Sequence, residues 1–127
     1  MKLNFIQITN MLSACEELKE IKMPFKLSLI LAKNISMLKA EQDFYIERER
    51  EFAIKFLATD ENGKFIQQND NSFKIKDGLI EECLEARDEL NNFEVDIELR
   101  KIPINLIEDM EFTLGQLTAL EMLIEEE

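Results

Sequence analysis

The sequence predicts a single α+β domain over residues 1–127, in which one long helix and two or three shorter helices pack on a small, mostly antiparallel β-sheet. Three observations support this class. Residues 25–57 contain no Gly or Pro and carry apolar side chains at helical spacing. Residues 1–6 and 93–99 alternate between apolar and polar side chains, as strands do. The whole chain has only 3 Gly and 2 Pro, so long regular elements should outweigh loops.

The first segment predicts a short strand over residues 2–6, which would lie in the sheet with residues 64–76 and 93–100. Thr9 or Asn10 is then expected to cap a helix, because both side chains accept hydrogen bonds from free backbone amides. That helix should end between residues 20 and 23, since Pro24 disfavours a helical residue before it. Its predicted buried stripe consists of Met11, Leu12, Cys15 and Leu18.

The second helix is predicted from Pro24 or Phe25 to Leu57. Its apolar stripe consists of Leu31, Ile35, Leu38, Tyr45, Phe52 and Phe56. The second half of this helix is densely charged, which supports two interpretations. One is a solvated face held by local ion pairs. The other is an exposed helix–helix seam of an oligomer through Tyr45, Phe52 and Phe56.

The middle of the chain contains a predicted turn, Asp60–Gly63, followed by a β-hairpin or ordered loop over residues 64–76. No internal repeat is apparent. Asp77 is expected to cap a third helix, Gly78–Asn91. A strand should follow with Phe93, Val95, Ile97 and Leu99 on its inner side.

The closing segment begins with a turn marked by Pro103 and continues with a capping box, Thr113–Gln116. The last helix is predicted to run through Leu117 and Leu120 to the terminal glutamates. Acidic side chains at the C-terminal end of a helix oppose its dipole, so a basic partner there would relieve the repulsion.

The formal net charge of −12 makes direct binding to nucleic acid or to an anionic membrane unfavourable. Cys15 and Cys83 each lie in an apolar helical pattern and are expected to be buried free thiols, which points to an intracellular, cytoplasmic protein. No signal-peptide core and no apolar run long enough to cross a bilayer is present in the sequence.

The residue types needed for common catalytic and metal sites are missing. His is absent, two isolated Cys cannot form a structural zinc site, and the glycines at 63, 78 and 115 form no phosphate-binding loop. We therefore expect no catalytic residue, no metal and no cofactor. The candidate functional residues are instead partner-binding ones, chosen for surplus acid or for aromatic exposure: Glu108, Asp109, Glu111, Glu125, Glu126, Glu127, Tyr45 and Phe52.

Four short stretches of the chain carry a resemblance to known sequences. They are the Met1-Lys-Leu start, the Met23-Pro-Phe-Lys26 entry to the long helix, the Asp60–Lys64 turn and the closing segment from Val95 to Glu127. With these motifs the chain resembles small acidic proteins of unknown function encoded by phages and prophages of gut and Gram-positive bacteria. The resemblance implies a phage protein that works in the bacterial cytoplasm, and it assigns no activity to any residue.

Charge, missing motifs and resemblance together predict a non-enzymatic protein–protein interaction module that acts through an acidic helical surface. It would serve as an accessory assembly factor for a virion component, or as an inhibitor of a basic host defence protein such as a nucleic-acid enzyme. Self-association into a homo-oligomer is a further expectation. The alternatives are a small carboxylate- or metal-dependent enzyme and an antitoxin-like partner protein.

Overall fold

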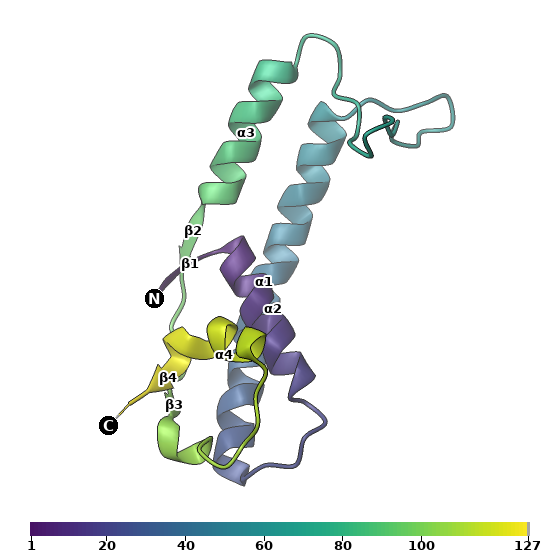
Figure 1. Cartoon of the computed structure of the whole chain (residues 1–127). Coiled ribbons are helices and arrows are strands. Elements are labelled where there is room, and N and C mark those ends of the chain that lie inside the picture. The colour runs from purple at the N-terminus through teal and green to yellow at the C-terminus, as the bar shows by residue number, and fades with distance from the viewer. Residues whose placement is uncertain (127) are drawn as a thin grey trace. The chain divides into compact units, whose positions relative to one another are not determined.

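A computed structural model describes residues 1–126 of the chain and contains four α-helices among them (Figure 1). The helices are α1 (Phe5–Glu17), α2 (Phe25–Phe56), α3 (Ile80–Asn92) and α4 (Leu114–Leu120). The predicted α+β class is confirmed in its coarse form, with helices dominant and strands short. By its internal contacts the chain divides into two compact units. Unit 1 consists of Met1–Asp43 and Glu94–Glu127, and unit 2 of Phe44–Phe93.

Two small sheets lie in unit 1. Strands β1 (Lys2–Asn4) and β2 (Glu94–Asp96) pair antiparallel, with Leu3 opposite Val95, so the predicted pairing of these two segments is confirmed. The second sheet is parallel and was not predicted: β3 (Ile102–Pro103) pairs with β4 (Ile124–Glu125). Residues 64–76 belong to neither sheet, because their only β-type pairings are isolated bridges within unit 2. The predicted three-segment sheet is wrong in that respect.

The first helix begins earlier than the sequence suggested. Asn4, rather than Thr9 or Asn10, is its N-cap: the Asn4 side chain accepts the Gln7 amide, and the Gln7 side chain accepts the Asn4 amide, both at 2.9 Å. This reciprocal pair satisfies two amides that a helix start leaves free, so the predicted strand ends at residue 4. The helix ends at Glu17, a few residues before the predicted position.

The core of unit 1 forms where α1 and the first part of α2 meet the segments around β2 and α4. Its fully buried side chains include Leu3, Ile8, Cys15, Leu27, Leu38, Ile102 and Leu123. Asn34 of α2 is also fully buried and forms two hydrogen bonds with one backbone unit. Its Oδ1 accepts the Arg100 amide at 2.8 Å, and its Nδ2 donates to the Arg100 carbonyl at 3.0 Å. These bonds fix the extended segment after β2 against the helix.

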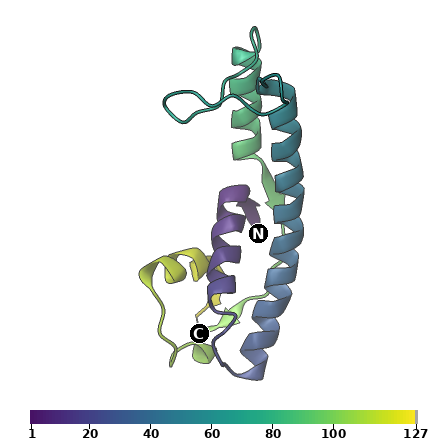
Figure 2. The ribbon, with the colours of Figure 1, turned by 90° about the vertical axis from the view of Figure 1, so that its right-hand side faces the viewer.

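The prediction of one long helix is confirmed, since α2 runs continuously over 32 residues (Figures 1 and 2). In unit 2 its last part packs beside α3, which runs in the opposite direction. Local ion pairs, Arg48–Glu51 at 3.3 Å and Arg50–Glu47 at 3.8 Å, lie on its surface, in agreement with the first of the two interpretations of this charged segment. The start of α3 differs from the prediction. Leu79 occupies its N-cap position without a side-chain hydrogen bond, and Asp77 does not cap it.

The loops of unit 2 contain a short structural repeat that the sequence did not reveal. Ala58, Ile66 and Lys74, spaced eight residues apart, form a closed ring of backbone hydrogen bonds. The Lys74 amide donates to Ile66, the Ile66 amide to Ala58, and the Ala58 amide to Lys74, at 2.8, 3.1 and 2.9 Å. Equivalent turns between these residues contain Gly63 and Asn71, both with positive φ. The predicted turn at residues 60–63 is the first of them.

The closing segment confirms the capping box but not the long terminal helix. Thr113 Oγ1 accepts the Gln116 amide, and the Gln116 side chain accepts the Thr113 amide. The helix ends at Leu120, and a 3₁₀ turn, η2 (Glu121–Leu123), leads into β4. Ile102 pairs with Ile124 there, so a long-range contact replaces the expected last helical turns. The predicted inner positions Ile97 and Leu99 are buried, whereas Phe93 is half-exposed.

Candidate interaction surface

Unit 1 contains a groove between α1 and α4 with a volume of about 690 Å³. Its wall of polar and small side chains includes one carboxylate, Glu17, and no basic residue. A groove of this volume has room for a small molecule or for one or two side chains of another protein. The lining residues are Gln7, Asn10, Met11, Ser13, Ala14, Glu17, Thr113, Leu114, Gly115, Gln116, Thr118, Ala119 and Met122.

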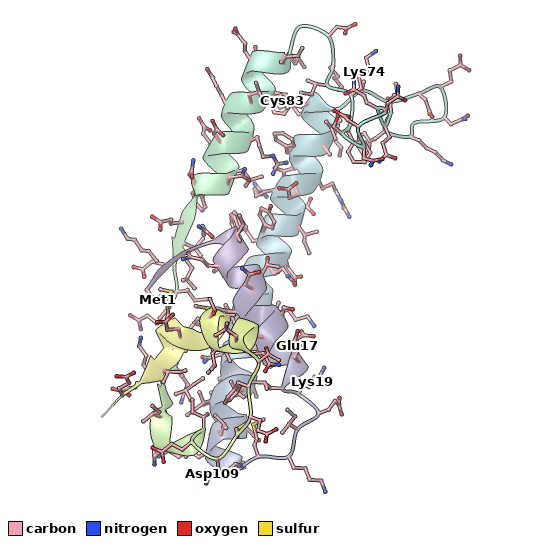
Figure 3. The ribbon with its side chains drawn as sticks, in the orientation of Figure 1. Met1, Glu17, Lys19, Lys74, Cys83 and Asp109 are labelled. Carbon is pink, nitrogen blue, oxygen red and sulfur yellow. The ribbon has the colours of Figure 1, made fainter. Side chains whose placement is uncertain are left out.

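Gln116 fixes the two sides of this groove relative to each other. Its carbonyl oxygen accepts the Thr113 amide at 2.9 Å, which completes the cap of α4. Its side-chain nitrogen donates to Glu17 Oε2 at 2.8 Å, near the C-terminal end of α1 (Figure 3). One residue therefore both starts α4 and ties it to α1. The sequence predicted the cap, but the bridge to a residue so distant along the chain gave no local signal.

Two apolar side chains of the groove remain open to solvent. Leu114, the first residue of α4, is 80% exposed, and Met122 of η2 is 44% exposed. These side chains expose apolar surface to water, and burial of either one against a partner would contribute favourable free energy to binding. Neither Glu17 nor these two residues was among the predicted site residues. For Leu114 the available signal was an apolar residue placed directly after the N-cap Thr113, and no comparable signal marked Glu17 or Met122 in the sequence.

The predicted acidic residues adjoin the two ends of the α4–η2 segment. Glu108, Asp109 and Glu111 are exposed in the loop between the 3₁₀ turn η1 (Ile104–Leu106) and α4, and Figure 3 shows Asp109 at the lower end of unit 1. Glu125 and Glu126 are exposed just after η2, which carries the groove residue Met122. Glu127 lies outside the described residues. After Glu94 the only basic residues are Arg100 and Lys101, so this segment is acidic in sum, and the Lys101 ammonium donates a hydrogen bond to the carbonyl of the groove residue Met122 at 2.7 Å.

The other two predicted site residues, Tyr45 and Phe52, lie in unit 2. The Arg87 guanidinium lies 4.1 Å above the Phe52 ring and forms a two-pronged ion pair with Glu49, in which Nη2 is 3.0 Å from Oε2. Burial, followed by a hydrogen bond to Glu49, raises the pKa of Tyr45. The hydrogen bond from Arg87 is the main reason that the pKa of Glu49 is lowered. The aromatic stripe of α2 is thus covered by α3 and is not the open seam that the sequence suggested.

Both cysteines are buried free thiols, as predicted. Burial, with a smaller contribution from the neighbouring Glu16 carboxylate, raises the pKa of Cys15 to about 11. At neutral pH this thiol is therefore protonated and a poor nucleophile.

Among residues 1–126, no group of three or more Cys, Asp or Glu side chains is placed to hold a metal ion. None of the helices in that same range combines the length and apolar character needed to cross a membrane.

Comparison with known protein families, with curated proteins and with solved structures found no match to this chain. The function therefore has to be argued from the chain's own residues.

Proposed function

We propose that this chain is a non-enzymatic protein-binding module that takes a basic segment of another protein along the α1/α4 groove of unit 1. The observation that carries the proposal is the groove itself: it has exposed apolar side chains, a single carboxylate and no basic residue. Acidic residues at both ends of α4–η2 extend the same charge beyond the groove.

The apolar side chains and the carboxylates would contribute to binding in different ways. Leu114 and Met122 offer apolar surface, which supplies affinity when it is buried at the centre of an interface. The carboxylates around them attract Lys or Arg from a distance, so they speed association and select against acidic proteins. A partner segment with one large apolar side chain between basic ones satisfies both.

Glu17 is the one carboxylate in the groove, and it is already hydrogen-bonded to Gln116. Acid–base catalysis by carboxylates ordinarily requires two such groups in defined positions, so this geometry favours binding over an enzymatic role.

Of the two phage-type roles, inhibition of a basic protein fits this surface better than assembly. Carboxylates imitate the charge of phosphate, and a protein that binds nucleic acid presents a basic site to them. An assembly factor would rely mainly on apolar contacts and would tolerate salt. The proposal includes the predicted location of the chain in the bacterial cytoplasm.

The test compares partner capture by three forms of the chain from lysate of a candidate bacterial host, at low and at high salt. One variant neutralises Glu108→Gln, Asp109→Asn and Glu111→Gln beside the groove. The matched control makes the same change in charge on α3, with Glu81→Gln, Glu82→Gln and Glu85→Gln. We expect a basic protein to be retained at low salt by the wild type and by the control.

The groove-side variant should bind that protein roughly tenfold more weakly, and Leu114→Ser should weaken it further. Equal binding by the groove-side variant and the wild type would contradict the proposal. Binding that survives high salt but fails with Leu114→Ser would support the assembly role instead.

A further inference from the structure

Residues 21–40 form a basic stretch in a chain that is otherwise acidic. They contain four lysines and no Asp or Glu, although the whole chain has 27 acidic residues. The stretch covers the end of the turn after α1 and the first half of α2, within unit 1. Its lysines are all exposed: Lys22, Lys26, Lys33 and Lys39. This part of the surface therefore attracts acidic groups, whereas the chain as a whole, with a net charge of −12, repels them.

The same stretch carries exposed apolar side chains. Phe25, the first residue of α2, is 80% exposed, and Leu29, one turn later, is 39% exposed. This first half of α2 buries Leu27, Leu31 and Leu38. Because successive residues turn by about 100° around a helix, Phe25 and Leu29 lie on the side opposite that buried stripe. They contribute little to the core and are available to a partner.

The backbone on both sides of Phe25 is held in place. The Ile21 amide donates to the Leu18 carbonyl at 3.1 Å, and the Ser28 amide donates to the Pro24 carbonyl at 3.0 Å. Pro24, whose own φ is restricted, directly precedes α2. We call Lys22–Lys26 the corner segment. Since its conformation is already fixed, a partner that binds it does not have to order it, which reduces the entropic cost of association.

The corner segment has the composition that the α1/α4 groove selects. Its exposed aromatic side chain, Phe25, lies between two exposed lysines, Lys22 and Lys26. The groove has an apolar side chain of the same exposure, since Leu114 is also 80% exposed. Among the large apolar side chains that the structure describes, these two are the most exposed. A contact between the corner segment and the groove would bury both of them.

The carboxylate of the groove is placed to accept a lysine. Gln116 donates to Oε2 of Glu17 at 2.8 Å and so fixes the carboxylate. Within residues 1–126 the other oxygen, Oε1, has no hydrogen-bond partner, and Glu17 is exposed. A lysine ammonium that approaches Oε1 therefore meets a carboxylate already in position, and it leaves intact the bond that joins α4 to α1.

The contact between corner segment and groove has to join two copies of the chain. Because Phe25 is 80% exposed, it lies outside the groove of its own chain. Its fixed turn directly follows α1, which forms one wall of that groove. The net charges of two copies repel each other at long range. At physiological ionic strength that repulsion is screened beyond about 8 Å, whereas charges in contact still attract.

We propose that the α1/α4 groove of one copy takes the corner segment of a second copy, with Phe25 of one packed on Leu114 of the other and a flanking lysine paired with Glu17. The corner segment is short, so the interface is small and association belongs in the range of roughly 100 μM. A partner protein must displace the second copy, so self-association limits partner capture when the chain is concentrated. The inference rests on the proposed function, because both use the same groove.

Sedimentation equilibrium of the full chain at physiological salt tests the proposal up to millimolar concentration. We expect the average mass to rise above the 14.9 kDa of the monomer as concentration rises. Phe25→Ser and Leu114→Ser should each weaken association at least tenfold. The control Leu84→Ser, which removes a 57% exposed leucine from unit 2, should associate like the wild type. A wild type that is monomeric at every concentration would overturn the proposal.

A mixture of the two variants tests which surfaces meet. Phe25→Ser keeps the groove and Leu114→Ser keeps the corner segment, so one intact contact can form between them, and the mixture should give a one-to-one complex. When Phe25→Ser is labelled with ¹⁵N, the amide signals of the groove residues Gly115 and Gln116 should shift on addition of unlabelled Leu114→Ser. Failure of the mixture to associate, when both variants keep wild-type circular dichroism, would contradict a contact between corner segment and groove.

The outcomes also separate this proposal from the proposed function. If the mixture associates but lysate yields no bound protein, the groove takes the corner segment and its role toward a host protein is wrong. If a basic protein is captured but the mixture does not associate, the proposed function stands and self-association through the groove is wrong. A monomeric wild type that binds phosphatidylglycerol vesicles, and loses that binding with Phe25→Ser, would assign the corner segment to a membrane surface instead.

Discussion

Asn34 is the one buried polar side chain among the residues that the structure describes. Its hydrogen-bond partners are the backbone groups of Arg100 rather than another side chain. Leu31 and Leu38 were predicted to lie on the buried stripe of the long helix, whereas the asparagine between them was not. A buried amide is tolerated when each of its groups has a partner, and Asn34 uses one donor and one acceptor on Arg100. The Asn34 side chain thus gives the Arg100 backbone the hydrogen-bond partners that a neighbouring strand would otherwise supply.

Asn34→Leu should lower the free energy of unfolding by about 1–3 kcal/mol. The substitution keeps an apolar side chain of similar size but leaves the Arg100 amide and carbonyl without their partner. Urea unfolding measures the loss, and amide hydrogen exchange at Arg100 should become faster in the folded state. Ser36→Ala, an exposed change on the same helix, should leave both measurements near wild type. Unchanged exchange at Arg100 would show that this pairing does not protect the segment.

The Glu49–Arg87 pair gives unit 2 a dependence on pH. Because its pKa is lowered in the folded state, Glu49 contributes stability that is present above its ordinary pKa, near 4.5, and lost as the pH falls through the folded value. Both side chains are about one third exposed, so the contribution at neutral pH should be about 1 kcal/mol.

Glu49→Gln should therefore cost stability at pH 7 and cost little at pH 3, as measured by urea unfolding at each pH. Arg87→Lys serves as the matched variant, since it keeps the charge but loses the two-pronged geometry and the planar contact with Phe52. It should lie between wild type and Glu49→Gln at pH 7. A cost of Glu49→Gln that is the same at both pH values would show that the ion pair is not its source.

At the scale of the element, two capping boxes begin the helices that flank the groove. Thr113 and Gln116 were recognised in the sequence, whereas Asn4 and Gln7 were not, although the spacing is the same. The alternation of the first six residues gave an equally good match to a strand. In the structure the helix begins at Phe5 instead. The reciprocal hydrogen bonds between Asn4 and Gln7 stabilise this helix start, because they satisfy two of the amides that the first turn of a helix leaves free.

Asn4→Ala should destabilise unit 1 by about 1 kcal/mol, since it removes the acceptor for the Gln7 amide. Asn4→Asp retains an acceptor and favours the helix dipole, so it should stay close to wild type. Thermal unfolding followed by circular dichroism compares the three proteins. If alanine and aspartate behave alike, the side chain of residue 4 is not the cap.

The long helix was predicted from its local pattern, whereas the β3–β4 pairing and the groove, which depend on distant contacts, were not predicted. The long helix lacks Gly and Pro and repeats its apolar residues, which is sufficient to specify it. The parallel pairing of Ile102 with Ile124 joins residues far apart in the chain, and the local sequence of the terminal segment predicted a helix instead. The groove has the same origin, because Glu17 and Gln116 meet only after α1 and α4 pack. The surplus of acid, by contrast, was visible in the composition.

For the whole molecule, the net charge of −12 sets two electrostatic effects against each other. Repulsion among the surplus carboxylates destabilises the folded chain, whereas ion pairs such as Arg48–Glu51 stabilise it. Salt screens both effects. The described side-chain ion pairs are partly or largely exposed, and such pairs contribute little, so relief of repulsion should dominate.

Raising NaCl from about 10 mM to about 150 mM, which shortens the screening length from roughly 30 Å to 8 Å, should therefore raise the melting temperature. A gain of about 1 kcal/mol corresponds to roughly 4 °C in a chain of this size. The variant with Glu108→Gln, Asp109→Asn and Glu111→Gln has less repulsion to relieve, so it should start from a higher melting temperature and gain less from salt. A melting temperature that falls with salt would mean that the ion pairs outweigh the surplus acid. In that case these three carboxylates would not destabilise the fold, and no binding partner would be needed to explain their presence.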